Sequence, residues 1–161
     1  MTKSLTESAD LELISRNEVA EIIHHHQTGQ RSLHAARPFK AGEYISPFEA
    51  GEILDTPNYL TIQVGDKKHI TLLPSFLQYV NHSCTPNSFF DISRMALAAL
   101  RDIEASEELT FFYPSTEYDM AQPFICYCGS QGCLRNIRGA RYLSKDIQNK
   151  YRFTDYIKQL L

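Results

Sequence analysis

The sequence has no hydrophobic run long enough to cross a lipid bilayer. The longest such run spans only residues 95–100, whereas a membrane-spanning helix needs about 20 apolar residues. The first ten residues also lack the apolar stretch of a secretory signal peptide. We therefore expect an intracellular protein of the cytoplasm or the nucleus, without a membrane partner.

An excess of charge of one sign is absent as well. The 161 residues carry a formal net charge of −3, whereas proteins that bind nucleic acid through phosphate contacts are usually strongly basic. The sequence therefore predicts no direct binding of nucleic acid. Hydrophobic and charged contents of 43% and 22% are typical of a globular domain. No repeat, linker or low-complexity tract divides the chain, so we expect one domain.

Cysteine is scarce, but its four copies are not scattered. Cys126, Cys128 and Cys133 form a C-x-C-x4-C cluster, and Cys84 precedes them. In a reducing compartment clustered cysteines favour a metal over disulfides, and Cys126 and Cys128 are poorly placed to pair with each other. Because four thiolates complete a tetrahedral zinc site, we expect one structural Zn²⁺ on these residues. The alternative is a set of unrelated buried or free thiols.

A run of three histidines, His24, His25 and His26, is a second candidate for metal binding. Along a strand the middle histidine would point away from its neighbours. No cluster of acidic residues or further histidines accompanies the run, so it predicts a polar strand or loop without a metal.

Short alternating segments bounded by turn residues predict a chain of short strands. The clearest signal is a hairpin in which residues 59–64 and 69–72 flank a turn. Further strands are expected at residues 32–35, 43–45, 95–100 and 108–113, and a short terminal helix at residues 155–161. The predicted fold class is mostly β, with many short strands and few helices.

Three motifs then occur in a fixed order. Asn81-His82-Ser83-Cys84 comes first, the strand Glu107-Glu108-Leu109-Thr110-Phe111-Phe112-Tyr113 follows, and the cysteine cluster ends the series. This order resembles the SET-domain protein-lysine methyltransferases that carry a post-SET zinc cluster, in their small stand-alone bacterial and fungal form. Residues 35–43 are similar to the family's A-x-R-x-I-x-x-G-E segment.

The resemblance implies a SET fold of several short curved sheets with few short helices. In such a fold the chain threads in a pseudoknot-like manner at the N-H-S-C motif. It also implies a disordered N-terminus at residues 1–8, a SET domain at residues 9–123, a post-SET zinc segment at residues 124–140 and a helical tail at residues 141–161.

The activity that the resemblance implies is methyl transfer from S-adenosylmethionine to a lysine side chain of a protein or peptide. Tyr113 would be the catalytic residue. The residues expected to bind the cofactor are Arg31, Ser32, Leu33, Tyr79, Asn81, His82 and Tyr113. The substrate channel would be lined by Phe48, Phe111 and Tyr113. Because Phe111 lacks the hydroxyl of a tyrosine, the resemblance favours di- or trimethylation.

The chain also departs from the family pattern at three places. Gln30-Arg31-Ser32 stands where the family usually has a G-x-G pair, Gln78 replaces an arginine, and Phe112 replaces an aspartate. The alternative hypothesis is therefore a catalytically degenerate, zinc-stabilised module that binds peptides. Retention of Tyr113 favours the enzyme.

Overall fold

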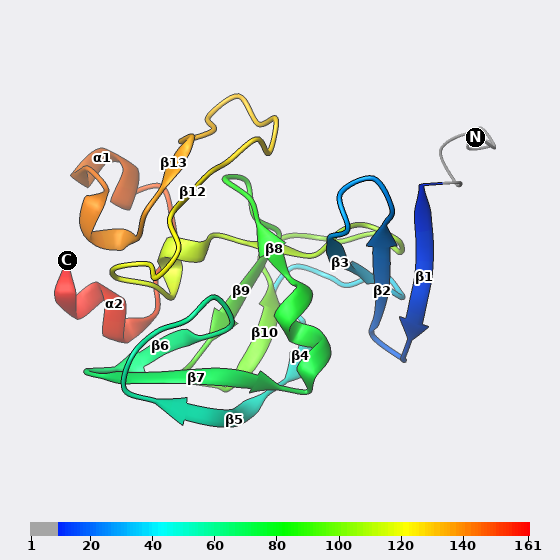
Figure 1. The fold of residues 1–161 in the computed structure, drawn as a ribbon, viewed down its shortest axis with the longest axis horizontal. Helices are drawn as coiled ribbons and strands as arrows, with labels where there is room; N and C mark the ends of the chain where they lie inside the picture. The colour runs from blue at the N-terminus through cyan, green and yellow to red at the C-terminus, as the bar shows by residue number, and fades with distance from the viewer. Residues whose placement is uncertain (1–9) are drawn as a thin grey trace.

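The computed structural model describes residues 10–161, so the expectation of a disordered segment at residues 1–8 lies outside the described part of the chain. The described residues form short strands in five small sheets (Figure 1). Helical structure is confined to single 3₁₀ turns and two short α-helices. The prediction of a mostly β fold with few helices is confirmed. No helix within residues 10–161 is long and apolar enough to span a membrane.

The first sheet is an antiparallel meander of β1 (Leu11–Arg16), β2 (Ala20–His25) and β3 (Arg31–Ala35). It lies at one end of the molecule, away from the C-terminal helices (Figure 1). Strand β1 was not predicted, because all its side chains are exposed and it carries no burial pattern. Of β2, only the histidine run at its end was expected to be a polar strand or loop.

His24 and His25 are the last two residues of β2, and His26 begins the turn that follows. The rings of His24 and His26 lie 5.1 Å apart, whereas His25 Nε2 lies 2.8 Å from the Ser32 hydroxyl. The prediction that the middle residue points away from its neighbours is confirmed.

The predicted hairpin is also present. It consists of β6 (Ile62–Gly65) and β7 (Lys68–Leu73), with Ile62 paired to Ile70. A further strand, β5 (Glu49–Leu54), pairs with the other edge of β7, so the hairpin is part of a three-stranded sheet.

The centre of the core is the sheet of β4 (Tyr44–Pro47), β10 (Ala96–Ala99) and β9 (Ser88–Asp91), in that order. All residues of β9 and β10 are buried, and Phe90 and Leu97 are fully so. Strands buried on both faces lack the polar alternation of a surface strand.

Two short strands bring distant parts of the chain together. Strand β8 (Asn81–His82) pairs in parallel with β11 (Thr110–Phe111), and His82 lies opposite Phe111. The expected strand at residues 108–113 is therefore shorter than predicted, because a 3₁₀ turn begins at Tyr113 and contains Pro114, which cannot donate a backbone hydrogen bond.

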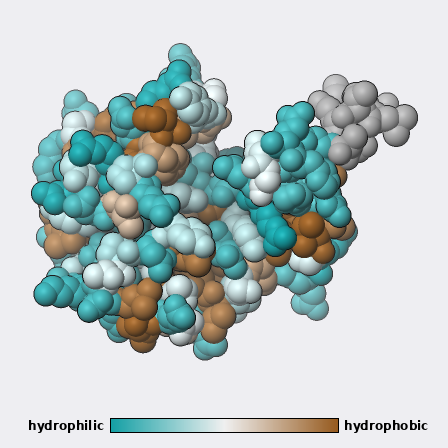
Figure 2. Space-filling view, in the orientation of Figure 1, coloured by the Kyte–Doolittle hydropathy of each residue, from teal (hydrophilic) through white to brown (hydrophobic). Residues whose placement is uncertain are grey.

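The chain after residue 120 folds back over this pair. Strands β12 (Phe124–Ile125) and β13 (Asn136–Ile137) flank the cysteine cluster, and they are followed by α1 (Lys145–Gln148) and α2 (Asp155–Leu160). The terminal helix was predicted, and its Ile157 is fully buried. The surface in Figure 2 is mostly hydrophilic, with hydrophobic residues in small separate areas.

Candidate active site and zinc site

The four cysteines come together although Cys84 is far from the others in sequence. Their four sulfur atoms lie within 4.8 Å of one another, and the sulfurs of Cys84 and Cys126 are 4.0 Å apart. In a tetrahedral site with Zn–S bonds of about 2.3 Å, sulfurs are about 3.8 Å apart. The donor set therefore fits one zinc ion with no position left open.

Burial acts against ionisation of two of the four thiols, those of Cys84 and Cys126, and raises the pKa of each. The nearby sulfurs of Cys126 and Cys128 raise the pKa of the Cys84 thiol further. A bound divalent cation reverses this effect, because the thiolate is the form that coordinates. The cluster is thus better suited to a metal than to four independent thiols.

His82 lies between the cysteines and Tyr113. Its Nδ1 accepts a hydrogen bond from the Tyr113 backbone nitrogen at 3.1 Å, and its Nε2 lies 3.4 Å from the Cys84 sulfur. Burial lowers the pKa of His82 to about 4, so the ring is neutral. Because Nδ1 accepts, the single ring proton is on Nε2 and faces the sulfur.

Asn81 fixes the neighbouring edge of the site. Its side-chain amide donates to the Arg31 carbonyl at 3.0 Å and to Glu108 at 3.4 Å. The Arg31 guanidinium in turn donates to the Tyr79 hydroxyl at 3.3 Å. Residues from β3, β8 and the 3₁₀ turn before β8 are therefore held together by polar contacts.

Tyr113 is half-buried in an aromatic group. Its ring centroid lies 4.7 Å from that of Phe111 and 5.8 Å from that of Phe124. Its hydroxyl donates to the Val80 carbonyl at 3.5 Å. Burial raises the pKa of Tyr113 to about 12, so the phenol keeps its proton and remains a hydrogen-bond donor.

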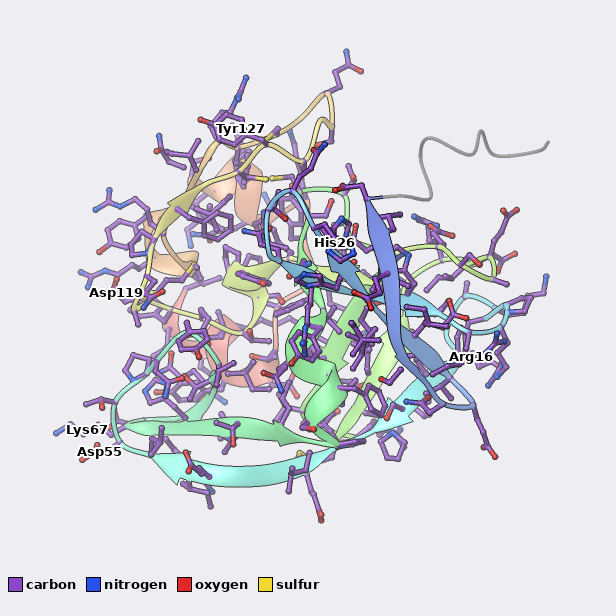
Figure 3. All side chains as sticks on the ribbon, turned by 45° about the vertical axis from the view of Figure 1, so that its right-hand side comes forward. Arg16, His26, Asp55, Lys67, Asp119 and Tyr127 are labelled. Atoms are coloured by element: carbon purple, nitrogen blue, oxygen red, sulfur yellow. The ribbon has the colours of Figure 1, made fainter. Side chains whose placement is uncertain are left out.

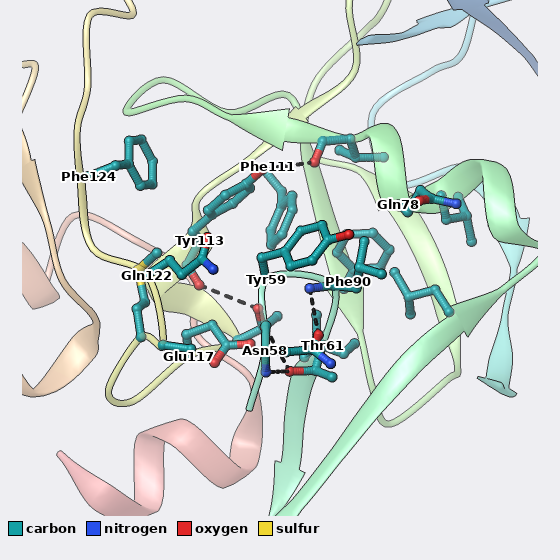
Figure 4. Close-up of a pocket in the computed structure, with 18 of the residues that line it drawn as sticks. Asn58, Tyr59, Thr61, Gln78, Phe90, Phe111, Tyr113, Glu117, Gln122 and Phe124 are labelled. Carbon is teal, nitrogen blue, oxygen red and sulfur yellow. Dashed lines mark hydrogen bonds between the residues drawn. The ribbon is translucent and has the colours of Figure 1, made fainter. Parts of the chain in front are cut away.

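Two hollows meet at this tyrosine. A cleft of about 610 Å³ is lined by Gln30, Arg31, Asn81, His82, Tyr113 and the segment from Phe124 to Cys128. A second hollow, a cavity of about 370 Å³, is lined by Phe90, Phe111 and Leu77, among others (Figure 4). Tyr113 and Phe124 line both hollows. Both volumes are in the range of small-molecule sites.

A family model described as the SET domain matches residues 30–114. The chain belongs to the SET-domain family. It is 40% identical over 123 residues to the methyltransferase flvH of Aspergillus flavus. The matched region covers 75% of this chain and 68% of flvH. It is 28% identical over 130 residues to the H3 lysine-36 specific histone-lysine N-methyltransferase of Yarrowia lipolytica, of which it spans 17%.

The methyltransferase domain of the human histone-lysine N-methyltransferase SETMAR has a similar fold. Its TM-score is 0.52 with 20% sequence identity, over 71% of this chain and 55% of that one. The recognition of a SET domain from three ordered motifs is therefore confirmed. The relatives named here are methyltransferases, and the four clustered cysteines of this chain are compatible with zinc.

The other residues expected at the site have different surroundings. Ser32 and Leu33 are buried in β3, and the Ser32 hydroxyl contacts His25 and His34. Phe48 is buried against Phe90 at 5.6 Å between ring centroids, one layer behind the cavity wall. For these residues the assigned roles stay predictions.

Sequence reasoning missed several residues of the site. Phe124 and Tyr127, which follow the 3₁₀ turn that begins at Tyr113, line the cleft. Tyr127 is 78% exposed at the outer side of its segment (Figure 3). Glu117, four residues after Tyr113, lines the cavity. An isolated acid in a polar segment has no sequence signal, because only the fold buries it.

The unusual Phe112 of this SET domain has a structural role. Its ring stacks on Tyr151 with centroids 3.7 Å apart and packs near Phe153 at 6.3 Å. The Tyr151 hydroxyl donates to the Cys84 carbonyl at 2.7 Å. The C-terminal tail is thus attached both to the strand that precedes Tyr113 and to the first zinc-cluster residue.

Proposed function

We propose that this SET domain transfers methyl groups from S-adenosylmethionine to a lysine side chain of a protein or peptide, with one structural Zn²⁺ on Cys84, Cys126, Cys128 and Cys133. The observation that carries the proposal is the pair of hollows that share Tyr113 and Phe124. Two reactants that enter from opposite sides would meet at one hydroxyl, which is the geometry of an in-line displacement.

The cleft is the side proposed for the methyl donor. S-adenosylmethionine supplies a methyl group on a positively charged sulfur. Arg31, Asn81 and His82 provide fixed polar groups along the cleft, which suit a ligand that joins an amino acid to a flat base. Where the family usually has a G-x-G pair, backbone groups of residues 30–32 would contact the methyl donor.

The cavity is the side proposed for the lysine. A lysine must lose its proton before its nitrogen lone pair can form the new N–C bond. The lining by Phe90, Phe111 and Tyr113 disfavours the charged form of a buried amine and lowers its pKa. The Tyr113 hydroxyl, protonated because of its raised pKa, would orient the reacting groups.

Phe111 supports more than one round of transfer. Its ring lines the cavity next to Tyr113 and offers no hydroxyl to hold a water molecule or to restrict rotation of the nitrogen. We therefore propose di- or trimethylation as the product. Because relatives carry histone names, basic histone tails are the first substrates to test.

The test is transfer of labelled methyl groups to histones, basic peptides and a proteome extract, followed by mapping of the modified residue. We expect label on lysine side chains with two or three methyl groups. Absence of measurable binding of S-adenosylmethionine to zinc-loaded protein would contradict the proposal and favour the alternative, a zinc-stabilised module that binds peptides without transfer.

A further inference from the structure

The substrate-side cavity contains one carboxylic acid, that of Glu117. The residue is 8% exposed, and its Oε1 is buried without a hydrogen-bond partner. A buried polar group without a partner is costly, so an acid in this state needs a reason. A ligand that supplies the missing partner is the simplest one.

The backbone around Glu117 is held by hydrogen bonds from other segments. The Glu117 carbonyl accepts from Ala140 at 2.9 Å, and the next residue, Tyr118, donates to Gln63 at 3.3 Å. At Gly139 the chain approaches so closely that an added Cβ would lie 2.5 Å from the Tyr118 carbonyl oxygen. The acid is therefore held in the cavity wall by segments on both sides.

Within residues 10–161 no ion pair to the Glu117 carboxyl is formed. The charged side chains beside Glu117 in sequence and on the hydrogen-bonded segments 138–141 and 154–158 are Asp119, Arg138, Arg141, Asp155 and Lys158. Arg141 pairs with Asp119 at 3.1 Å, and the Arg138 guanidinium lies 3.9 Å from the centroid of the Tyr142 ring. Asp155 and Lys158, both on α2, are exposed. Burial alone raises the pKa of Glu117 to about 9, so the acid is protonated at neutral pH in the empty cavity.

The position of Glu117 separates it from the reacting end of the cavity. In Figure 4 it lies near Asn58 and Thr61, whereas Phe111 lies at the opposite side. The five heavy atoms of a lysine side chain need roughly 150 Å³ at about 30 Å³ per water-sized group. The cavity of about 370 Å³ therefore has room for a second group.

We propose, on the basis of the proposed function, that Glu117 selects substrates that carry a second basic side chain beside the acceptor lysine. Binding of that cation breaks the O–H bond of the acid and releases the proton to solvent. The resulting carboxylate then pairs with the ammonium or guanidinium group. Arginine is the better partner, because its planar guanidinium can bond to both carboxylate oxygens.

The test uses the zinc-loaded protein with all 161 residues and alanine-based seven-residue peptides with a central lysine. One set carries a single arginine at each position from two before to two after the lysine, and the matched set carries neutral citrulline. For wild type we expect at least one position at which arginine raises kcat/KM about tenfold or more over citrulline. In Glu117→Gln this preference should fall to about one, and the citrulline peptides should react as in wild type. Glu18→Gln, an exposed acid in the turn between β1 and β2, should keep the preference.

A preference that survives in Glu117→Gln, or an equal loss of rate on both peptide sets, would overturn the proposal.

Calorimetry in two buffers of different ionisation enthalpy tests the proposal independently of transfer. Binding of the preferred arginine peptide should release a proton from wild type but not from Glu117→Gln. If wild type transfers no methyl group yet shows this release, the proposed function fails and the role of Glu117 stands. If it binds no arginine peptide in preference to citrulline, the role of Glu117 fails.

Discussion

The two hollows that meet at Tyr113 are built in different ways. On the cleft side the polar groups have partners inside the protein, as Asn81 has in Arg31 and His82 has in Tyr113 and Cys84. On the cavity side the wall is mostly apolar, and its one acid has an unpartnered oxygen. The first side is prepared before a ligand arrives, whereas the second depends on a ligand to complete it.

Loss of zinc is expected to have the broadest effect, because it should lower both cofactor affinity and stability. Cys84 lies two residues after β8, and the other three cysteines lie in or just after the segment 124–128 that lines the cleft. Chelation of the zinc should therefore release this segment from β8. We expect affinity for S-adenosylmethionine to fall about tenfold or more, with a lower Tm. Metal analysis should give one zinc per chain, and calorimetry with and without chelator measures the affinity. Normal binding by the stripped protein would show that cleft and metal are independent.

Truncation of the ring that attaches the C-terminal tail comes next. Phe112 is 2% exposed and stacked on Tyr151, so Phe112→Ala should lower the free energy of unfolding by about 3–5 kcal/mol. Denaturant unfolding measures this change. Phe112→Leu, which keeps most of the apolar volume, serves as control and should lose clearly less. Equal losses in both would mean that the aromatic stack is unimportant.

Removal of the hydroxyl shared by the two hollows should affect the rate and leave binding unchanged. For Tyr113→Phe we expect kcat to fall about 10²- to 10³-fold, with affinity for S-adenosylmethionine within about threefold of wild type. The matched control is Tyr44→Phe, since Tyr44 is 50% exposed on β4 and should not matter. Unchanged turnover in Tyr113→Phe would remove this residue from the reaction.

The last effect concerns stability against pH. Glu117 has a pKa raised by burial from 4.5 to about 9, so between these values the folded protein binds a proton that the unfolded chain lacks. The free energy of unfolding should therefore fall as pH rises from about 5 to 9. Glu117→Gln should remove this part of the decline. Parallel curves for both proteins in thermal unfolding would show that Glu117 is not buried as an acid.

The sequence predicted the parts of this molecule that follow a local or a motif pattern. The hairpin of β6 and β7 and the helix after Asp155 follow alternation and amphipathicity, and the zinc cluster follows cysteine spacing. Strand β1 was missed because its side chains are all exposed. Phe112 was seen only as a departure from the family, since its partner Tyr151 is distant in sequence. Glu117 was missed because the segments that hold its backbone, those of Gln63 and Ala140, are distant in sequence and leave no local pattern.

The measurement that tests the account most directly is a crystal structure of the zinc-loaded protein with S-adenosylhomocysteine and a lysine peptide. We predict the nucleoside in the cleft beside Asn81 and His82, and the lysine side chain in the cavity beside Phe111. The sulfur and the lysine nitrogen should face each other at the Tyr113 hydroxyl. Both ligands in the same hollow, or a nucleoside bound in the cavity beside Asn58, would contradict the account.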